Sequence, residues 1–96
     1  MDREQFLLVK LAEECNEVAQ MAIKSMQFGL DNVKPDQPYT NRERLNQEFN
    51  DLITIMQLLS QENYLEHEPP SPEWIEEKLG RIEKFYNISK EMGKIK

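Results

Sequence analysis

Apolar positions recur every three or four residues over most of the chain, which is the spacing of one face of an α-helix. The first such stretch covers residues 3–27 and contains no Gly or Pro before Gly29, a residue typical of helix ends. Its apolar stripe consists of Leu8, Leu11, Cys15, Val18, Ala22 and Met26, widened by Ala12 and Ala19. We predict a long amphipathic helix over residues 3–27, with this stripe packed in a core.

Two further helices are predicted by the same spacing and by their first residues. Thr40 and Glu43 form a capping-box pattern, from which a helix runs over about residues 41–63. Ser71 followed by Pro72 is typical of the start of a third helix. The apolar stripe of the second helix is Leu45, Phe49, Leu52, Met56 and Leu59, flanked by Ile53 and Ile55; that of the third is Ile75, Leu79, Ile82 and Tyr86.

The segments between the helices contain residues that oppose regular structure. Residues 29–39 hold one Gly, two Pro and three Asp or Asn residues, and Pro69 and Pro70 stop any continuation of the second helix. No segment has the pattern of a strand, so we predict an all-α fold of three main helices. Helices of this size leave apolar stripes on more than one side, so we expect a homodimer or homotetramer to complete a helical bundle.

Length and composition narrow the class of protein. The 96 residues suit one domain, residues 1–96, and a net charge of −6 argues against binding to duplex nucleic acid. A single cysteine, Cys15, excludes an intrachain disulfide and fits a reducing compartment. Residues 1–5 are charged and lack the apolar core of a signal peptide, and there is no apolar run of the ~20 residues that a membrane span needs. We therefore expect a soluble, cytoplasmic protein without membrane contact.

A repeated arrangement of acidic residues distinguishes the first two helices. Lys10–Val18 aligns with Arg44–Leu52 at an offset of 34 residues. The alignment matches a basic residue, an asparagine and two acids, which helical periodicity alone does not require. The acid pairs are Glu14 with Glu17 and Glu48 with Asp51.

The helix geometry places each acid pair beside the core. If the leucine of each motif is at the centre of the stripe, the first acid lies about 60° to one side and the second about 120° on that side. Glu13 lies further round and is more exposed. Two such helices side by side bring four mutually repelling carboxylates together, and Mg²⁺ or Mn²⁺ suits this all-oxygen ligand set. A di-iron site is disfavoured because the only histidine, His67, lies in a Pro-rich loop.

These acids carry a family resemblance. Glu13–Glu17 followed by Glu48–Asp51 resembles the EExxE…ExxD signature of MazG-like nucleotide pyrophosphohydrolases, which belong to the all-α NTP pyrophosphatase superfamily. Lys10–Gly29 is similar to small single-domain members, and Lys78–Phe85 resembles their last helix. The resemblance implies Mg²⁺-dependent cleavage of nucleoside triphosphates between the α and β phosphates, giving the monophosphate and pyrophosphate, and at least a dimer.

The resemblance also implies roles for individual residues. The Mg²⁺ ligands would be Glu14, Glu17, Glu48 and Asp51, with Glu13 as a supporting or water-orienting member of the catalytic set, and the triphosphate contacts would be Lys78, Arg81 and Lys84. Phe28, at the end of the first helix, is a candidate base contact or a core residue. The interval between Glu17 and Glu48 holds 30 residues (18–47), which is long for the motif and leaves the base preference open.

Two other functions fit the same residues. In a non-catalytic helical oligomerisation module, the acids would be only a solvated surface. In a related enzyme of the phosphoribosyl-ATP pyrophosphatase type, the same metal site would act on a different substrate. A nucleophilic mechanism is not expected, because the lone Cys15 and the lone His67 lie on different elements.

Overall fold

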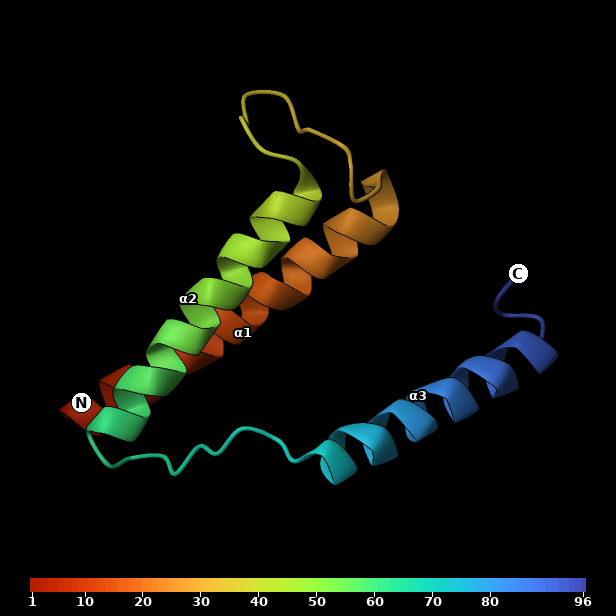
Figure 1. The fold of residues 1–96 in the computed structure, drawn as a ribbon. Coiled ribbons are helices and arrows are strands. Elements are labelled where there is room, and N and C mark those ends of the chain that lie inside the picture. The colour runs from red at the N-terminus through yellow and green to blue at the C-terminus, as the bar shows by residue number, and fades with distance from the viewer.

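Three α-helices joined by two loops make up the computed structural model, which describes residues 1–96 (Figure 1). Helix α1 spans Arg3–Phe28, α2 spans Asn41–Gln61 and α3 spans Pro72–Glu91. There are no β-strands, so the predicted all-α class with three main helices is confirmed. Helices α1 and α2 lie antiparallel as a hairpin, whereas α3 lies apart and packs against neither (Figure 1).

The helices begin at the capping residues that the sequence indicates. The Thr40 hydroxyl accepts the Glu43 N–H at 3.1 Å, and the Glu43 carboxylate accepts the Thr40 N–H at 3.2 Å. The Ser71 hydroxyl accepts the Trp74 N–H at 3.1 Å at the start of α3. Each bond satisfies an N–H that the first turn of a helix leaves without a partner. These local bonds explain why the helix boundaries could be predicted from the sequence.

Helices α1 and α2 pack along a seam in which buried or half-buried residues alternate at steps of four and three. This seven-residue period is typical of paired helices. The seam residues are Leu7, Leu11, Glu14, Val18, Met21 and Ser25 in α1, and Asn41, Leu45, Glu48, Leu52, Ile55 and Leu59 in α2. Only Leu7, Met21 and Leu59 are buried and apolar, so the core is small. Two seam positions are glutamates, which brings acids into the helix–helix contact.

The prediction of the α1 core was partly wrong. Leu8, Cys15 and Met26 are exposed, as are Phe49 and Ile53 of α2. Helix α1 is apolar around more than half of its circumference, and the single neighbour α2 covers only one side of it. We call the exposed side chains Leu8, Cys15, Met26, Phe49 and Ile53, which the helical spacing places on one side of the hairpin, the outer apolar face.

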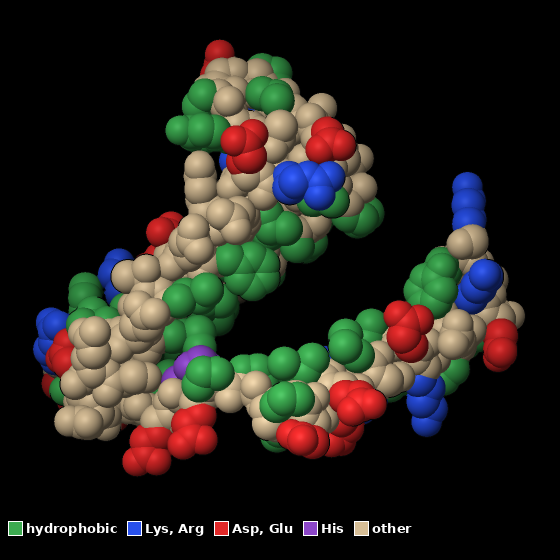
Figure 2. Space-filling model, in the orientation of Figure 1, with side chains coloured by type: hydrophobic (Ala, Val, Ile, Leu, Met, Phe, Trp, Pro, Cys, Tyr) green, Lys and Arg blue, Asp and Glu red, His purple; other side chains and the backbone are tan.

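No residue of α3 that belongs to its apolar stripe is buried. Ile75, Leu79, Ile82 and Tyr86 are all exposed. Hydrophobic side chains line both sides of the open hollow between α3 and the hairpin (Figure 2). The radius of gyration is 16.9 Å, against about 13 Å for a compact chain of this length. The chain alone therefore does not form a closed bundle. None of its helices has the length and apolarity needed to cross a membrane.

Gly80 offers a test of what covers α3. A Cβ atom built at Gly80 meets no atom within 4 Å. Gly80→Ala is therefore expected to stabilise α3 by up to ~1 kcal/mol, because alanine loses less backbone entropy than glycine inside a helix. Urea unfolding followed by circular dichroism measures the change. A clear loss of stability would show instead that another surface packs closely on Gly80.

Candidate metal centre

Three carboxylates from the two hairpin helices meet beside the seam. Glu14 and Glu17 of α1 and Glu48 of α2 each bring one carboxylate oxygen to within 4.8 Å of the others. Asp51, one helical turn beyond Glu48, shares with Glu14 the lining of a neighbouring pocket of about 390 Å³. The structure thus brings the four predicted metal ligands to one side of the hairpin. We call these four residues the acid cluster.

The seam forces part of this charge out of contact with water. Glu14 and Glu48 occupy seam positions, and the Oε2 atom of each is buried without a hydrogen-bond partner. A buried carboxylate oxygen without a partner costs free energy, since it has lost its hydration and gained nothing in exchange. A bound cation would supply the missing partner for both atoms.

The same surroundings raise the pKa values of both seam glutamates. Burial raises the pKa of Glu14 most, followed by the charges of Glu17 and Asp51, with Lys10 acting in the opposite direction. Burial also raises the pKa of Glu48, followed by the close approach of the Glu17 carboxylate and by the neighbouring carboxylate charges. The folded chain therefore favours protonation of these two groups. A cation at the cluster would favour their charged forms instead.

Glu13 lies outside the cluster. Its carboxylate is exposed and accepts a hydrogen bond from Lys10 Nζ at 3.1 Å. Lys10 also lies 5.4 Å from the centre of the Phe6 ring and lines the pocket beside Glu14 and Asp51. Lys10 was not predicted as a site residue. In the sequence repeat Lys10 aligns with Arg44, and this match of basic residues is the signal that could have identified it.

The predicted triphosphate contacts do not reach the acid cluster. Lys78, Arg81 and Lys84 are exposed on α3, which contacts neither hairpin helix. Phe28 is exposed at the end of α1 and lines a second pocket at the tip of the hairpin. Along the two hairpin helices, the basic residues nearest to the acids in sequence are Lys10, before Glu14, and Lys24 and Arg44, toward the 29–39 loop.

The acid cluster offers only carboxylate oxygens as ligands. This donor set suits Mg²⁺ or Mn²⁺ and contains no nitrogen or sulfur ligand of the kind that zinc favours. Comparison of the chain with protein-family models, with curated proteins and with solved structures found no match. The candidate site is therefore defined by its own residues and geometry.

Proposed function

We propose that this chain is a Mg²⁺-dependent nucleoside triphosphate pyrophosphohydrolase, which converts (d)NTP into (d)NMP and pyrophosphate. The observation that carries the proposal is the convergence of Glu14, Glu17 and Glu48, with two carboxylate oxygens buried and unpartnered. The resemblance of Glu13–Glu17 and Glu48–Asp51 to the EExxE…ExxD signature supports the same activity.

The residues of the cluster fit Mg²⁺, with Mn²⁺ as a substitute of similar preference. Glu14, Glu17, Glu48 and Asp51 would hold the metal, which would relieve the repulsion among them. Mg²⁺ held there would supply charge neutralisation for the phosphates and activation of a water molecule. Glu13 holds Lys10 by an ion pair at the edge of the neighbouring pocket, where the ammonium group can contact a phosphate oxygen.

Pyrophosphate release from a panel of NTPs and dNTPs with Mg²⁺ tests the proposal. We expect the wild type to form equal amounts of monophosphate and pyrophosphate, and Glu14→Ala and Asp51→Ala to be inactive. Glu91→Ala, an exposed acid on α3, is the control and keeps full activity. Orthophosphate as the product, or full activity in the cluster variants, would refute the proposal. Phosphoribosyl-ATP in the same panel tests for the related pyrophosphatase.

We also propose that the chain acts as a homodimer or homotetramer. The outer apolar face and the uncovered stripe of α3 leave large apolar side chains in solvent, which is unusual for a stable single chain. A second copy would cover these surfaces and complete a helical bundle.

Charged residues on the outer apolar face are expected to break this assembly. Sedimentation of the wild type should give the mass of a dimer or tetramer, and that of the double variant Phe49→Asp/Ile53→Asp the mass of a monomer, because burying two unpaired carboxylates is costly. Gln57→Asp/Gln61→Asp adds the same charge at exposed polar positions of α2 and should leave the mass unchanged. A monomeric wild type would contradict the proposal.

The extent of unpartnered apolar surface also favours a second candidate, a non-catalytic helical assembly module. In that case the acid cluster is only surface. Glu48→Ala would then leave assembly unchanged, calorimetry would detect no Mg²⁺ binding, and no nucleotide of the panel would be hydrolysed.

A further inference from the structure

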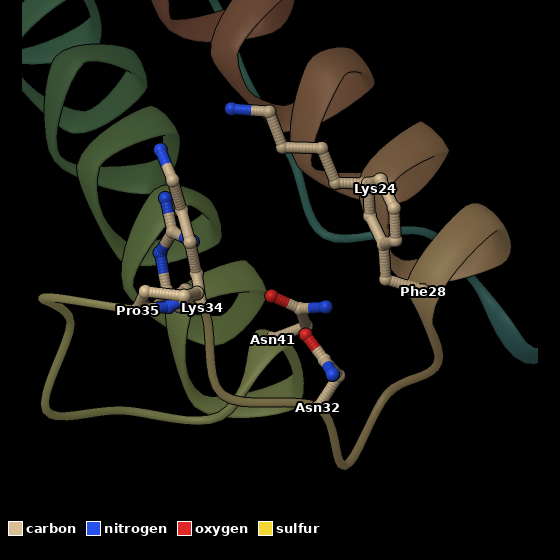
Figure 3. Close-up of a pocket in the computed structure, with 7 residues that line it drawn as sticks. Lys24, Phe28, Asn32, Lys34, Pro35 and Asn41 are labelled. Atoms are coloured by element: carbon tan, nitrogen blue, oxygen red, sulfur yellow. The ribbon is translucent and has the colours of Figure 1, made fainter.

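A second pocket lies at the tip of the hairpin, where the 29–39 loop joins the two helices. Its volume is about 350 Å³, and its basic lining comes from three elements: Lys24 of α1, Lys34 of the loop and Arg44 of α2. Phe28 and Asn41 also line this pocket. Figure 3 shows Lys24 and Lys34 on opposite sides of this pocket, which we call the tip pocket.

The three cations of the tip pocket have no carboxylate partner. The ion pairs of the structure belong to other basic residues: Arg3, Lys10 and Arg42. Three basic side chains without an ion pair thus line one pocket, although the whole chain has a net charge of −6. An anion in the pocket would give these side chains a partner of opposite charge.

Backbone and side-chain bonds hold the walls of the tip pocket in place. The Asn41 side chain, only 2% exposed, donates from Nδ2 to the Gly29 carbonyl at 2.9 Å. The Asn41 N–H donates to the Asn32 carbonyl at 2.9 Å, and the Arg42 N–H to the Leu30 carbonyl at 2.8 Å. Gly29 has φ +95°, which glycine adopts without strain. The loop is therefore tied to the start of α2, and the tip pocket is preformed.

The tip pocket and the acid cluster lie on the same flank of the hairpin. Lys24 follows Glu17 by seven residues, and Arg44 precedes Asp51 by seven. Seven residues make almost two turns of helix, so each pair projects from the same side, about 10 Å apart along the axis. A ligand that extends along this flank from the acids toward the loop enters the tip pocket.

We propose that the tip pocket binds a pyrophosphate group, which in the substrate is the pair of terminal phosphates. This inference rests on the proposed function for its place in the reaction. The volume of the tip pocket, near the lower limit for ligand pockets, has room for a compact anion. Unpaired cations suit phosphate oxygens, with the Arg44 guanidinium able to bind two at once.

The position of the tip pocket gives its cations a role in the cleavage. The oxygen of water forms a bond to the α phosphorus, and the bond from that phosphorus to the bridging oxygen breaks. The electron pair of the broken bond moves to the departing pyrophosphate, and the proton of the water is released. The positive charges of Lys24, Lys34 and Arg44 stabilise the negative charge that develops on this leaving group.

Calorimetric titration of the full chain with inorganic pyrophosphate, in EDTA and without divalent metal, tests the inference. We expect binding by the wild type and at least tenfold weaker binding by Lys24→Gln/Arg44→Gln. Lys90→Gln/Lys94→Gln removes the same charge from exposed positions near the C-terminus and should bind as the wild type does. Circular dichroism verifies that both variants are folded.

Three results would overturn the inference: no binding by the wild type, equal affinity in the tip variant, or an equal loss in the Lys90→Gln/Lys94→Gln control. Tip-dependent binding of AMP in preference to pyrophosphate would also overturn it, since the pocket would then hold a nucleoside. Because no metal or hydrolysis enters this titration, its failure leaves the proposed activity standing. Conversely, an inactive chain that binds pyrophosphate through Lys24 and Arg44 would refute only the proposed function.

Discussion

Glu48→Gln is expected to lower Mg²⁺-dependent nucleotide hydrolysis by about 10²–10³-fold, the loss typical of removing one group that stabilises transition-state charge. Glu48 lies on the seam and is one of the three carboxylates that converge. Glutamine keeps the volume of the side chain and removes only its charge, so the packing of α1 on α2 is retained. Pyrophosphate release at saturating nucleotide measures the effect.

In the absence of metal, Glu48→Gln is expected to stabilise the folded chain. The pKa of Glu48 is raised in the fold, so the folded chain binds a proton more tightly than the unfolded chain does. The free energy of unfolding therefore falls as the pH rises from the ordinary carboxyl pKa through the raised pKa of Glu48. Glu48→Gln should raise the Tm at neutral pH without metal, flatten this pH dependence and weaken the rise in Tm that Mg²⁺ produces.

Glu73→Gln provides the matched control for both measurements. Glu73 is an exposed acid in the first turn of α3, away from the cluster. It should change neither the hydrolysis rate nor the response of the Tm to Mg²⁺. If Glu48→Gln were fully active, or as responsive to Mg²⁺ as Glu73→Gln, then Glu48 would not be a metal ligand.

Leu59→Ala is expected to destabilise the chain by about 2–5 kcal/mol, the range for truncating a buried leucine. Leu59 is 0% exposed and is one of only three buried apolar residues. Since a domain of this kind is stable by about 5–15 kcal/mol, this loss is a large share of the total. Urea unfolding followed by circular dichroism measures it.

Leu30→Ala is the control for this prediction, because Leu30 lies half in solvent in the loop after α1. It removes the same atoms and should cost much less. A loss at Leu59 no greater than at Leu30 would mean that the α1–α2 seam contributes little to stability. The fold would then depend on contacts between copies of the chain.

The helices could be predicted from the sequence because their limits depend on nearby residues. Thr40, Glu43 and Ser71 bond within three residues of themselves, and these bonds form in any context that allows the helix. The side of α1 that is buried could not be predicted in the same way. Leu7 and Leu8 are adjacent and equally apolar, and only the position of α2 decides that Leu7 is buried and Leu8 exposed.

The acid cluster could be predicted in part for a similar reason. The repeat between Lys10–Val18 and Arg44–Leu52 fixes which acids share a flank, and an antiparallel hairpin then brings the flanks together. The tip pocket could not be predicted, because the 29–39 loop has no periodicity. Its course depends on bonds between Asn41 and the backbone of Gly29 and Asn32, which only the folded loop brings together.

The most direct test of the central claim is hydrolysis in ¹⁸O-labelled water, with the products separated and analysed by ³¹P NMR. The wild type, a nucleoside triphosphate and Mg²⁺ should give only monophosphate and pyrophosphate, with the label in the monophosphate, since water attacks the α phosphorus. Diphosphate and orthophosphate as products, or label in the pyrophosphate, would contradict the account.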